Sequence, residues 1–536
     1  GQALVQGLRA QGVDLVFGLP GIQLDWAFDA LYAERHALRV VHTRHEQAVS
    51  YMADGYARTT GRVGVCIMVP GPGLLNASAG LATAYACSSP VLCITGQIPS
   101  RDIGMGRGLL HEIGDQMGAI RSITKWTARA ARPADVPEVV REAFRRLLTG
   151  RPRPVAIEIP PDALQETAEI PPVGRVEGEL LAPDPEVIEQ AARALGAAAR
   201  PIIFAGGGVL RAAAWEPLRQ LAELLEAPVC MTDNGKGAVS ARHPLALPMV
   251  AASELTPTSD VALAVGTRFY QPARSDWGPR SGQTVIQLDV DREEIGRNCP
   301  VTIGIQSDAR AGLEALVAAV GRHNRTRASR REELASARAA AQALLETLQP
   351  QAAYGAAIRD VLPDDGILVS EMTQVGYWAN AGFPVYAPRT FLTSGYQGTL
   401  GHGLANAIGA QAGAPGRKVV SINGDGGFMY NVQELSTMAR HRLNVVAIVF
   451  NDGAFGNVLR TQREAFGGRT IASDLLNPEF VRLAEAFGID GARAETPAAL
   501  RTALAGALAY DRPALIEVPI GEVKNLRTVI RPGYRG

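Results

Sequence analysis

The chain is poor in cysteine, in runs of like charge and in long apolar stretches, and each absence excludes a class of protein. Its cysteines (Cys66, Cys87, Cys93, Cys230 and Cys299) are odd in number and lack metal-binding or redox spacing, so neither a disulfide framework nor a zinc site is expected. Basic and acidic residues number 53 each and form no long run of one sign, which argues against nucleic-acid and membrane-surface binding. No apolar stretch reaches membrane-spanning length, and we recognise no secretory leader. We therefore expect a reduced, cytoplasmic protein.

What the chain does have is an alternation of strand-like and helix-like segments along most of its 536 residues. At about 150 residues per domain this length predicts three or four domains. The alternation predicts an α/β protein of three doubly wound parallel-sheet domains. Proline-rich and charged stretches separate an N-terminal domain, 1–165, a middle domain, 186–322, and a C-terminal domain, 350–536. An Arg-Pro pair, Arg153-Pro154 or Arg512-Pro513, introduces the last strand of the first and of the third domain, which suggests related topologies.

Two acidic residues, Asp425 and Asp452, stand 27 positions apart, and each directly follows an apolar run. The runs, Val419 to Ile422 and Val445 to Phe450, have the pattern of buried strands, and the segment between them is long enough for one helical crossover. Parallel strands end at the same edge of a sheet, where α/β folds bind ligands. Two carboxylates beside a glycine turn suit a Mg²⁺-diphosphate site. The alternative is a pair of loop carboxylates that cap helices.

A third acidic position lies near the other end of the chain. Leu38 to His42 has the pattern of a strand, and Arg44 to Gln47 opens a helical pattern that continues to Ala57. Glu46 is thus predicted at the carboxyl end of a strand and at the start of a helix. Taken alone, the residue is explained as a first-turn glutamate that the helix dipole favours.

Together these segments resemble the two halves of the cofactor site in thiamine-diphosphate (ThDP) enzymes, and in particular the acetolactate synthase and benzaldehyde lyase branch. Gly424-Asp425-Gly426-Gly427 followed by Asn451-Asp452 is similar to the motif of the diphosphate-binding domain, although the family carries Asn at the last position. Arg44 to Ala48 is similar to the motif of the pyrimidine-binding domain. The motifs stand in the family's order, and the resemblance covers essentially the whole chain. Further matching segments are Phe17 to Gly21, Pro70 to Gly73 with Asn76, Thr95 to Gln97, Ser122 to Lys125 and Ser394 to Gly401.

The resemblance implies a role for each motif. Glu46 would hydrogen-bond N1′ of the cofactor's aminopyrimidine and promote the imino tautomer that removes the C2 proton. Burial would help this carboxyl to exchange a proton near neutral pH, whereas the helix start would oppose that. Asp425, Asp452 and the backbone carbonyl of Ala454 would hold Mg²⁺.

Other residues would contact the cofactor itself. The N–H groups of Gly426 and Gly427 would face the diphosphate at a helix start. Leu400 would lie under the bent cofactor, although a core leucine fits this residue equally well. The remaining positions that match cofactor contacts are Pro70, Gly73, Asn76, Gln374, Gly398 and Gly424.

The family adds a 2-keto acid to C2, releases CO₂ and passes the carbanion to an acceptor. Gln23, Gln97 and His111 align with residues on the substrate side. Several substitutions separate the chain from acetolactate synthases and leave the acceptor open, while Mg²⁺ is still expected to bind. They are Asp452 for Asn, His111 for Gln, Thr461 for Trp, Val375 for His and Ile22 for Gly.

The middle domain resembles the FAD-binding domain of acetolactate synthases at two glycine turns, Gly206-Gly207-Gly208 and Gly266-Thr267-Arg268, and at Asp289. The segment between His243 and Asp260 is shorter, however, and lacks the Gly-Met-His-Gly stretch that lines the flavin. FAD is one candidate occupant, and the ADP part of coenzyme A is another. The second would suit a 2-hydroxyacyl-CoA lyase or an oxalyl-CoA decarboxylase, with a basic pocket formed by Arg268, Arg274 or Arg280.

Glu46 and Asp425 are predicted on different domains. In the family they meet between subunits, which implies a homodimer or homotetramer with its active site at the subunit interface. The leading interpretation is a ThDP- and Mg²⁺-dependent lyase or carboligase acting on a 2-keto acid. A coenzyme A lyase and a catalytically silent regulatory homologue are the alternatives, and the presence of Glu46 argues against the second.

Overall fold

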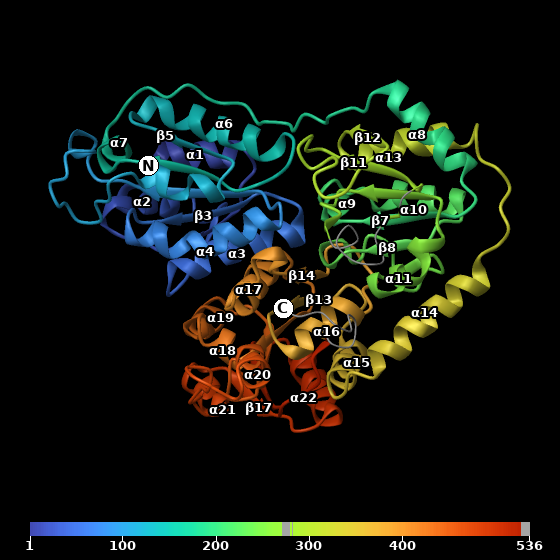
Figure 1. Cartoon of the computed structure of the whole chain (residues 1–536). Coiled ribbons are helices and arrows are strands. Elements are labelled where there is room, and N and C mark those ends of the chain that lie inside the picture. The colour runs from blue at the N-terminus through green and yellow to red at the C-terminus, as the bar shows by residue number, and fades with distance from the viewer. Residues whose placement is uncertain (271–278, 281, 527–536) are drawn as a thin grey trace. The chain divides into compact units, whose positions relative to one another are not determined.

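A computed structural model describes residues 1–270, 279–280 and 282–526 (Figure 1). The chain forms three six-stranded sheets flanked by helices, which confirms the predicted α/β class. Internal contacts group the chain into two compact units. The first comprises Gly1–Glu179, Ser394–Ala494 and Ala503–Pro519, and the second comprises Leu180–Thr393, Glu495–Thr502 and the residues from Ile520 onward. The predicted domain boundaries stay a prediction, because each unit combines segments from more than one of those ranges.

The first sheet has the strand order β2-β1-β3-β4-β6-β5, and its neighbouring strands are parallel. β3 and β6 are buried along their whole length, as expected for strands that helices cover on both faces. Its strands are β1 Leu15–Gly18, β2 Arg39–His42, β3 Gly64–Met68, β4 Val91–Gly96, β5 Trp126–Arg129 and β6 Val155–Ile159. The helices around it are α1 Gln2–Ala10, α2 Asp25–Ala33, α3 Glu46–Thr60, α4 Pro72–Ala86, α5 Gln116–Ile120, α6 Val136–Leu148 and α7 Pro161–Gln165.

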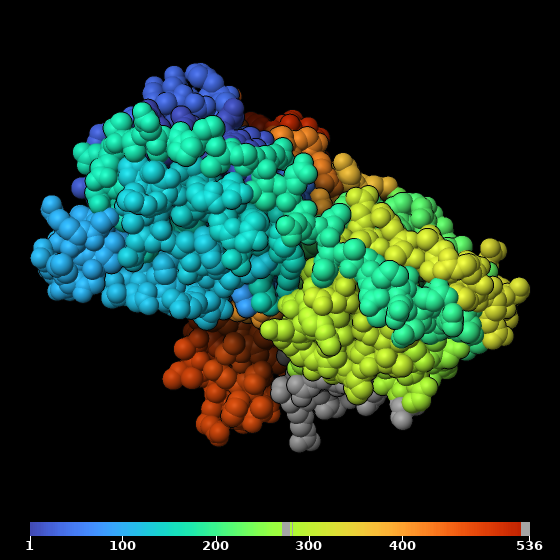
Figure 2. Space-filling view, turned by 90° about the horizontal axis from the view of Figure 1, so that it is seen from above, coloured from blue at the N-terminus to red at the C-terminus, as the bar shows by residue number. Residues whose placement is uncertain are grey.

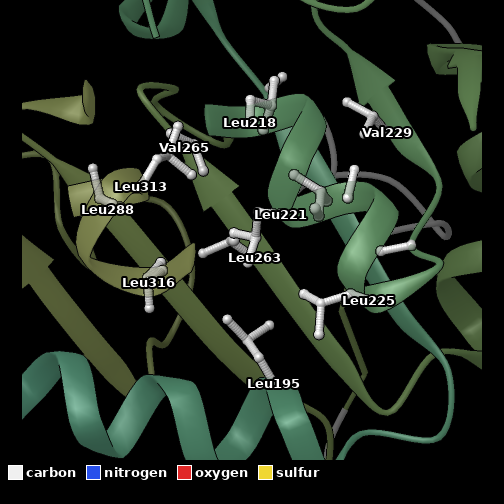
Figure 3. Packing of buried hydrophobic residues seen from close by; sticks show 14 of the residues in the cluster. Leu195, Leu218, Leu221, Leu225, Val229, Leu263, Val265, Leu288, Leu313 and Leu316 are labelled. Carbon is white, nitrogen blue, oxygen red and sulfur yellow. The ribbon is translucent and has the colours of Figure 1, made fainter. Parts of the chain in front are cut away.

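The second sheet has the order β12-β11-β10-β7-β8-β9. Leucines of its helices interdigitate with strand residues to form a core, seen from close by in Figure 3 and including Leu195, Leu218, Leu221, Leu225, Val229, Leu263, Val265, Leu288, Leu313 and Leu316. The strands are β7 Pro201–Ala205, β8 Val229–Met231, β9 Ala246–Pro248, β10 Val261–Val265, β11 Thr284–Asp289 and β12 Ile303–Gln306. The helices are α8 Pro185–Ala197, α9 Gly207–Arg211, α10 Trp215–Leu225, α11 Ala252–Leu255, α13 Ala309–Val320 and α14 Arg331–Glu346.

The third sheet has the order β14-β13-β15-β16-β18-β17, which is the order of the first sheet with every strand number raised by 12. This repeat bears out the related topologies that the two Arg-Pro pairs suggest. Its strands are β13 Ile367–Ser370, β14 Phe391–Thr393, β15 Val419–Gly424, β16 Val445–Asn451, β17 Asp490–Arg493 and β18 Ala514–Pro519. The helices are α15 Gln351–Val361, α16 Gln374–Gly382, α17 His402–Gly413, α18 Asp425–Phe428, α19 Leu435–His441, α20 Gly456–Ala465, α21 Phe480–Ala486 and α22 Pro497–Tyr510.

Helix α3 lies at the centre of the first unit, between α4 and α17 (Figure 1). Twelve of its 15 residues are buried. A Cβ atom on Gly55 would lie 2.1 Å from the carbonyl oxygen of Asn406, and one on Gly409 would lie 2.0 Å from that of Met52. The two helices therefore approach backbone to backbone, which only glycine at these positions allows.

Residues 166–184 form neither helix nor strand until α8, and most of them are exposed. Figure 2 shows this stretch as a green band across the outside of the first unit. Gln11 holds it through both ends of its amide, donating to the Gly174 carbonyl and accepting from the Val176 N–H, each at 2.9 Å. The predicted surface connection is confirmed.

All five cysteines are described, no disulfide joins them, and four of them are buried. Among the described residues, no helix combines the length and the apolar character needed to cross a bilayer.

Candidate active site

Asp425 and Asp452 follow neighbouring parallel strands, as the sequence predicts. β15 and β16 pair in a register that sets Gly424 opposite Phe450, so both carboxyls leave the same edge of the sheet. Both strands are almost wholly buried, because each is an apolar run. Asp425 opens the four-residue helix α18 and is 2% exposed, while Asp452 is half-buried in the turn before α20.

The two carboxyl groups are in contact. Burial together with the charge of Asp425 raises the pKa of Asp452 to about 7. Burial also raises the pKa of Asp425, although Asn477 (2.6 Å) and the N–H of Gly453 (2.9 Å) donate to it. Two adjoining carboxyls without a counter-charge retain a proton, because ionising both is costly. A divalent cation would replace that proton.

The backbone of Ala454 faces the same place. Ala454 forms an antiparallel bridge with Asp474, and the N–H of Phe455 and the carbonyl of Gly453 make its hydrogen bonds. The N–H and C=O of Ala454 itself therefore point to the other side. Its N–H meets the Asp452 carboxyl at 3.3 Å, so its carbonyl lies on the carboxyl side.

This donor set fits Mg²⁺ better than a metal that needs a complete protein cage. Mg²⁺ binds one or two carboxylates and completes its octahedron with phosphate oxygens and water. Within the described parts of the chain, no cluster of three or more histidine, cysteine or acidic side chains could hold a metal alone. The ligand set of Asp425, Asp452 and Ala454 stays a prediction that the geometry suits.

Sequence reasoning missed the residues that support this pair. Asn477 donates to Asp425 and to Asn451 (2.9 Å), and Asn451 donates to Glu517 at 2.8 Å. Glu517 carries a signal in the sequence, since it is a single carboxylate inside an apolar strand. Asn477 carries none, because it lies in an irregular loop whose position only the fold decides.

Three predicted residues meet at the start of α3. His45 caps the helix with its ring nitrogen, and Glu46 is the first helical residue. The Oε2 of Glu46 accepts from Asn76 at 3.0 Å, and a Cβ on Gly73 would lie 3.4 Å from its Oε1. The carbonyl of Pro70 accepts from the Gly73 N–H at 3.3 Å, which joins the fourth predicted position to the group.

Gln23 and His111 form a second pair. The His111 Nδ1 lies 3.0 Å from the Gln23 Oε1, and Gln23 donates to the Leu110 carbonyl at 3.1 Å. His111 has a φ of +68°, and its carbonyl packs against Gly71 so closely that a Cβ there would lie 2.3 Å away. This strained loop brings the imidazole beside the turn that leads to Gly73.

Gln97 does not join that pair. Its amide donates to Glu158 at 3.0 Å and accepts from the Ile98 N–H at 2.8 Å. Gln116 donates to Glu158 as well, at 2.9 Å, and Arg129 forms an ion pair with it. Both polar ends of Gln97 are therefore occupied within the N-terminal sheet, and its catalytic role stays a prediction.

Gly398 and Leu400 lie in a turn before α17. Gly398 has a φ of +58° and Gly401 a φ of +83°, and Leu400 between them is half-buried. Asn431 donates to the Gly401 carbonyl at 2.7 Å, which ties the turn to the segment that begins at Asp425. Gln374 opens α16 in the second unit and is 8% exposed.

Comparison with known proteins agrees with these motifs. Models of the thiamine pyrophosphate enzymes match the chain three times, as the N-terminal TPP binding domain at residues 1–119, the central domain at 188–316 and the C-terminal TPP binding domain at 371–518. A probable acetolactate synthase large subunit of Methanococcus aeolicus is 35% identical over all of this chain and 94% of its own length. The chain belongs to the thiamine pyrophosphate enzyme family.

Other relatives of this ThDP enzyme carry two kinds of name. The acetolactate synthase isozyme 2 large subunit of Escherichia coli is 34% identical, over 99% of this chain and 97% of the relative. A probable 2-ketoarginine decarboxylase of Pseudomonas aeruginosa is 37% identical, over 91% of this chain and 88% of the relative. The predicted ThDP-dependent enzyme, in an acetolactate-synthase-like branch, is confirmed.

Three positions at which this ThDP enzyme differs from acetolactate synthases lie in different surroundings. Val375 is fully buried in α16, whereas Ile22 is 65% exposed. Thr461 is exposed on α20, where its hydroxyl donates to the Asn457 carbonyl at 2.9 Å. Thr461 and Ile22 are thus accessible at the surface of this chain, whereas Val375 is enclosed.

The glycine turns of the middle domain have a packing role of their own. A Cβ on Gly206 would lie 2.2 Å from the Gly266 carbonyl oxygen, so the loops after β7 and β10 touch backbone to backbone. Gly266 also has a φ of +56°. Among the residues predicted for a coenzyme A pocket, Arg268 and Arg280 are described and Arg274 lies outside the described residues.

Proposed function

We propose that this enzyme uses ThDP and Mg²⁺ to decarboxylate a small 2-keto acid and to pass the resulting carbanion to an acceptor, as an acetolactate-synthase-like carboligase. The observation that carries the proposal is the contacting pair Asp425 and Asp452 at the ends of two parallel strands. The names acetolactate synthase and 2-ketoarginine decarboxylase among its relatives support carboligation and loss of CO₂ respectively.

Different residues of this chain would bind the metal and move the proton. Asp425, Asp452 and the Ala454 carbonyl would hold Mg²⁺, and Gly424, Gly426 and Gly427 would contact the diphosphate beside it. Bound ThDP supplies the electron sink that no side chain offers. Glu46 would hold and move the proton at the aminopyrimidine nitrogen, while Asn76 orients its carboxyl through the second oxygen.

The pair Gln23 and His111 would bind the substrate. Both present polar groups at the carboxyl ends of the first sheet's strands, and an imidazole can donate to a carboxylate or keto oxygen. Leu400 and the glycine turn at Gly398 would support the cofactor, with Gln374 as a further contact. We place this site in a cytoplasmic homodimer or homotetramer, with Glu46 and Asp425 of one active site supplied by different subunits.

A plain decarboxylase is the second candidate, and Thr461 favours it. The exposed hydroxyl stands where acetolactate synthases carry the Trp that selects the acceptor keto acid. Without that surface a proton can serve as the acceptor, and an aldehyde leaves instead of a hydroxy-keto acid.

The test is incubation of purified protein with ThDP, Mg²⁺ and each of pyruvate, 2-oxobutyrate and 2-ketoarginine. We expect CO₂ release from at least one, and NMR of the product separates a carboligation product from an aldehyde. Glu46→Gln should reduce CO₂ release at least 100-fold, in the range of lost proton transfer. No CO₂ from any keto acid under conditions where ThDP binds would overturn the proposal.

A further inference from the structure

Glu434 is a fully buried carboxyl that belongs to neither half of the proposed site. It lies nine residues after Asp425, immediately before α19. The backbone N–H of Arg44 donates to both its oxygens, at 3.1 and 3.2 Å. Thr437 donates its hydroxyl at 2.6 Å. The carboxyl thus joins two chain segments 390 residues apart in sequence, both within the first unit.

The contact continues on both sides of Glu434. The N–H of His42 donates to the His441 Nε2 at 3.3 Å, and the same nitrogen lies 3.1 Å from the His42 Nδ1. Thr437 also reaches the His42 carbonyl, at 3.4 Å. The connection from β2 to α3 is therefore docked along the start and the length of α19.

The groups around Glu434 make the burial of its carboxyl energetically unfavourable. Burial raises the pKa of Glu434 to about 7. Burial lowers the pKa of His441 to about 4 and also lowers that of His42, with contributions from Arg440, so neither imidazole is a counter-ion at neutral pH. Across the described residues, no lysine or arginine side chain forms an ion pair with Glu434. Burying an apolar residue here would cost less free energy, so what the carboxyl contributes is its hold on the Arg44 N–H.

That N–H group belongs to Arg44, two residues before Glu46. A carboxylate that accepts one N–H through both oxygens fixes the peptide plane that carries it, because each bond restrains direction as well as distance. Glu46 is the first residue of α3, so the direction of its Cα–Cβ bond depends on the orientation of this plane. Catalytic proton transfer tolerates little error, and a displacement of about 1 Å can cost about 100-fold in rate.

We propose that Glu434 is a positioning residue that fixes the backbone at Arg44 and thereby aims the carboxyl of Glu46. The inference rests on the proposed function in taking Glu46 as the proton relay. Glu434 follows Asp425 on one continuous segment, so within one chain the segment that would bind the metal also sets the relay carboxyl.

The test compares Glu434→Gln with Glu294→Gln. Gln keeps the volume of Glu434 but replaces one acceptor oxygen with a donor, so the Arg44 N–H loses one of its two acceptors and faces an amide N–H₂ group in its place. Glu294 is a glutamate of the second unit that is equally buried and forms an ion pair with Arg297, and it is the matched control. The first measurement, on protein without cofactor, is hydrogen exchange at the Arg44 amide. The second is deuterium exchange at C2 of bound ThDP, with the dissociation constant for ThDP measured alongside.

We expect Glu434→Gln to speed amide exchange at Arg44 at least tenfold and to slow C2 exchange about tenfold or more, while ThDP affinity changes less than about threefold. Glu294→Gln should change none of the three. Unchanged amide exchange overturns the proposal, and so does faster amide exchange with normal C2 exchange, since Glu434 would then be structural only. A wild-type protein that binds ThDP without C2 exchange would defeat the proposed function instead, and the amide measurement would still decide whether Glu434 holds the start of α3.

Discussion

The two aspartates of the candidate metal site differ in their burial and in their hydrogen bonds. Asp425 is buried and also holds Asn477 and the N–H of Gly453, whereas Asp452 is half-buried and contacts its own turn. We expect Asp425→Ala to weaken Mg²⁺-dependent ThDP binding on the order of 100-fold, about 2.7 kcal/mol. Asp452→Asn, which keeps an oxygen ligand, should stay within about fivefold of wild type. Calorimetric titration with ThDP at fixed Mg²⁺ measures both.

A titration without Mg²⁺ is the control, since neither variant should then differ from wild type. Equal losses in the two variants would contradict the assignment, because they would mean that the charge of Asp452, rather than its oxygen, is required.

Glu434 gives the protein a pH dependence of known sign. Its pKa rises from 4.5 to about 7 in the folded chain, so between these values the folded state binds more protons than the unfolded state. The stability it contributes is complete below about pH 4.5 and is lost as the pH rises through about 7, by up to about 3 kcal/mol. His441 and His42, with lowered pKa values, act in the opposite direction and lose stability as the pH falls.

The difference between wild type and Glu434→Gln cancels the histidines, which both proteins share. From pH 5 to pH 8, urea unfolding should show the wild type losing up to about 3 kcal/mol relative to Glu434→Gln. A difference that is constant across this range would show that Glu434 titrates at its ordinary value.

At the scale of elements, the approach of α3 to α17 leaves no room for a side chain at Gly55. Alanine at position 55 gains about 1 kcal/mol in helix propensity, but its Cβ would lie 2.1 Å from a backbone oxygen that cannot move alone. We expect Gly55→Ala to destabilise the protein by about 2 to 3 kcal/mol, as overpacking does. The measurement is the shift of the urea midpoint.

Gly506→Ala on α22 is the matched control. It is also a helical glycine, with no atom within 4 Å of its Cβ position, so the propensity gain of about 1 kcal/mol should appear alone. If the two variants shift the midpoint in the same direction, the tight approach of α3 and α17 does not limit stability.

Much of the element-level structure could be predicted, because it depends on local patterns. The apolar runs before Asp425 and Asp452 are β15 and β16, and Glu46 does open a helix after a strand. Parallel pairing then follows from the crossover length, so the proximity of the two aspartates could be predicted. The supporting residues Asn477 and Glu434 could not be predicted, because they act through contacts that no sequence periodicity indicates.

Gln97 is a second residue whose contacts the sequence does not predict. Its place after β4 predicts exposure at the ligand edge of the sheet, but its amide instead donates a hydrogen bond to the buried Glu158. A carboxylate inside an apolar strand was the available signal, and the repeat of this feature at Glu517 strengthens it. Both glutamates stand opposite an arginine of the edge strand, Arg129 and Arg493.

At the scale of the whole molecule, the proposed sharing of an active site between subunits can be tested by complementation. Glu46→Gln and Asp425→Ala should each be inactive alone. When co-expressed, half of the dimers combine both chains, and one site in each of these dimers carries neither change. We expect about a quarter of wild-type CO₂ release from the mixture.

The measurement needs the mixed dimers to be separated, for example by two affinity tags, so that their activity can be related to their number. A mixture as inactive as its parents would show that Glu46 and Asp425 serve one site from the same chain. Active monomers in sedimentation would contradict the shared site directly.

The burial of α3 also has a consequence for synthesis. Its last residue, Thr60, is translated 342 residues before His402, where the helix that covers it begins. At roughly 5 to 20 residues per second, the ribosome needs roughly 20 to 70 s for that interval. Throughout this time, the face of α3 that α17 will cover stays without its partner, so the nascent N-terminal part is a natural client for chaperones. The segment that carries Glu46 is among the first to be made and among the last to reach its final surroundings.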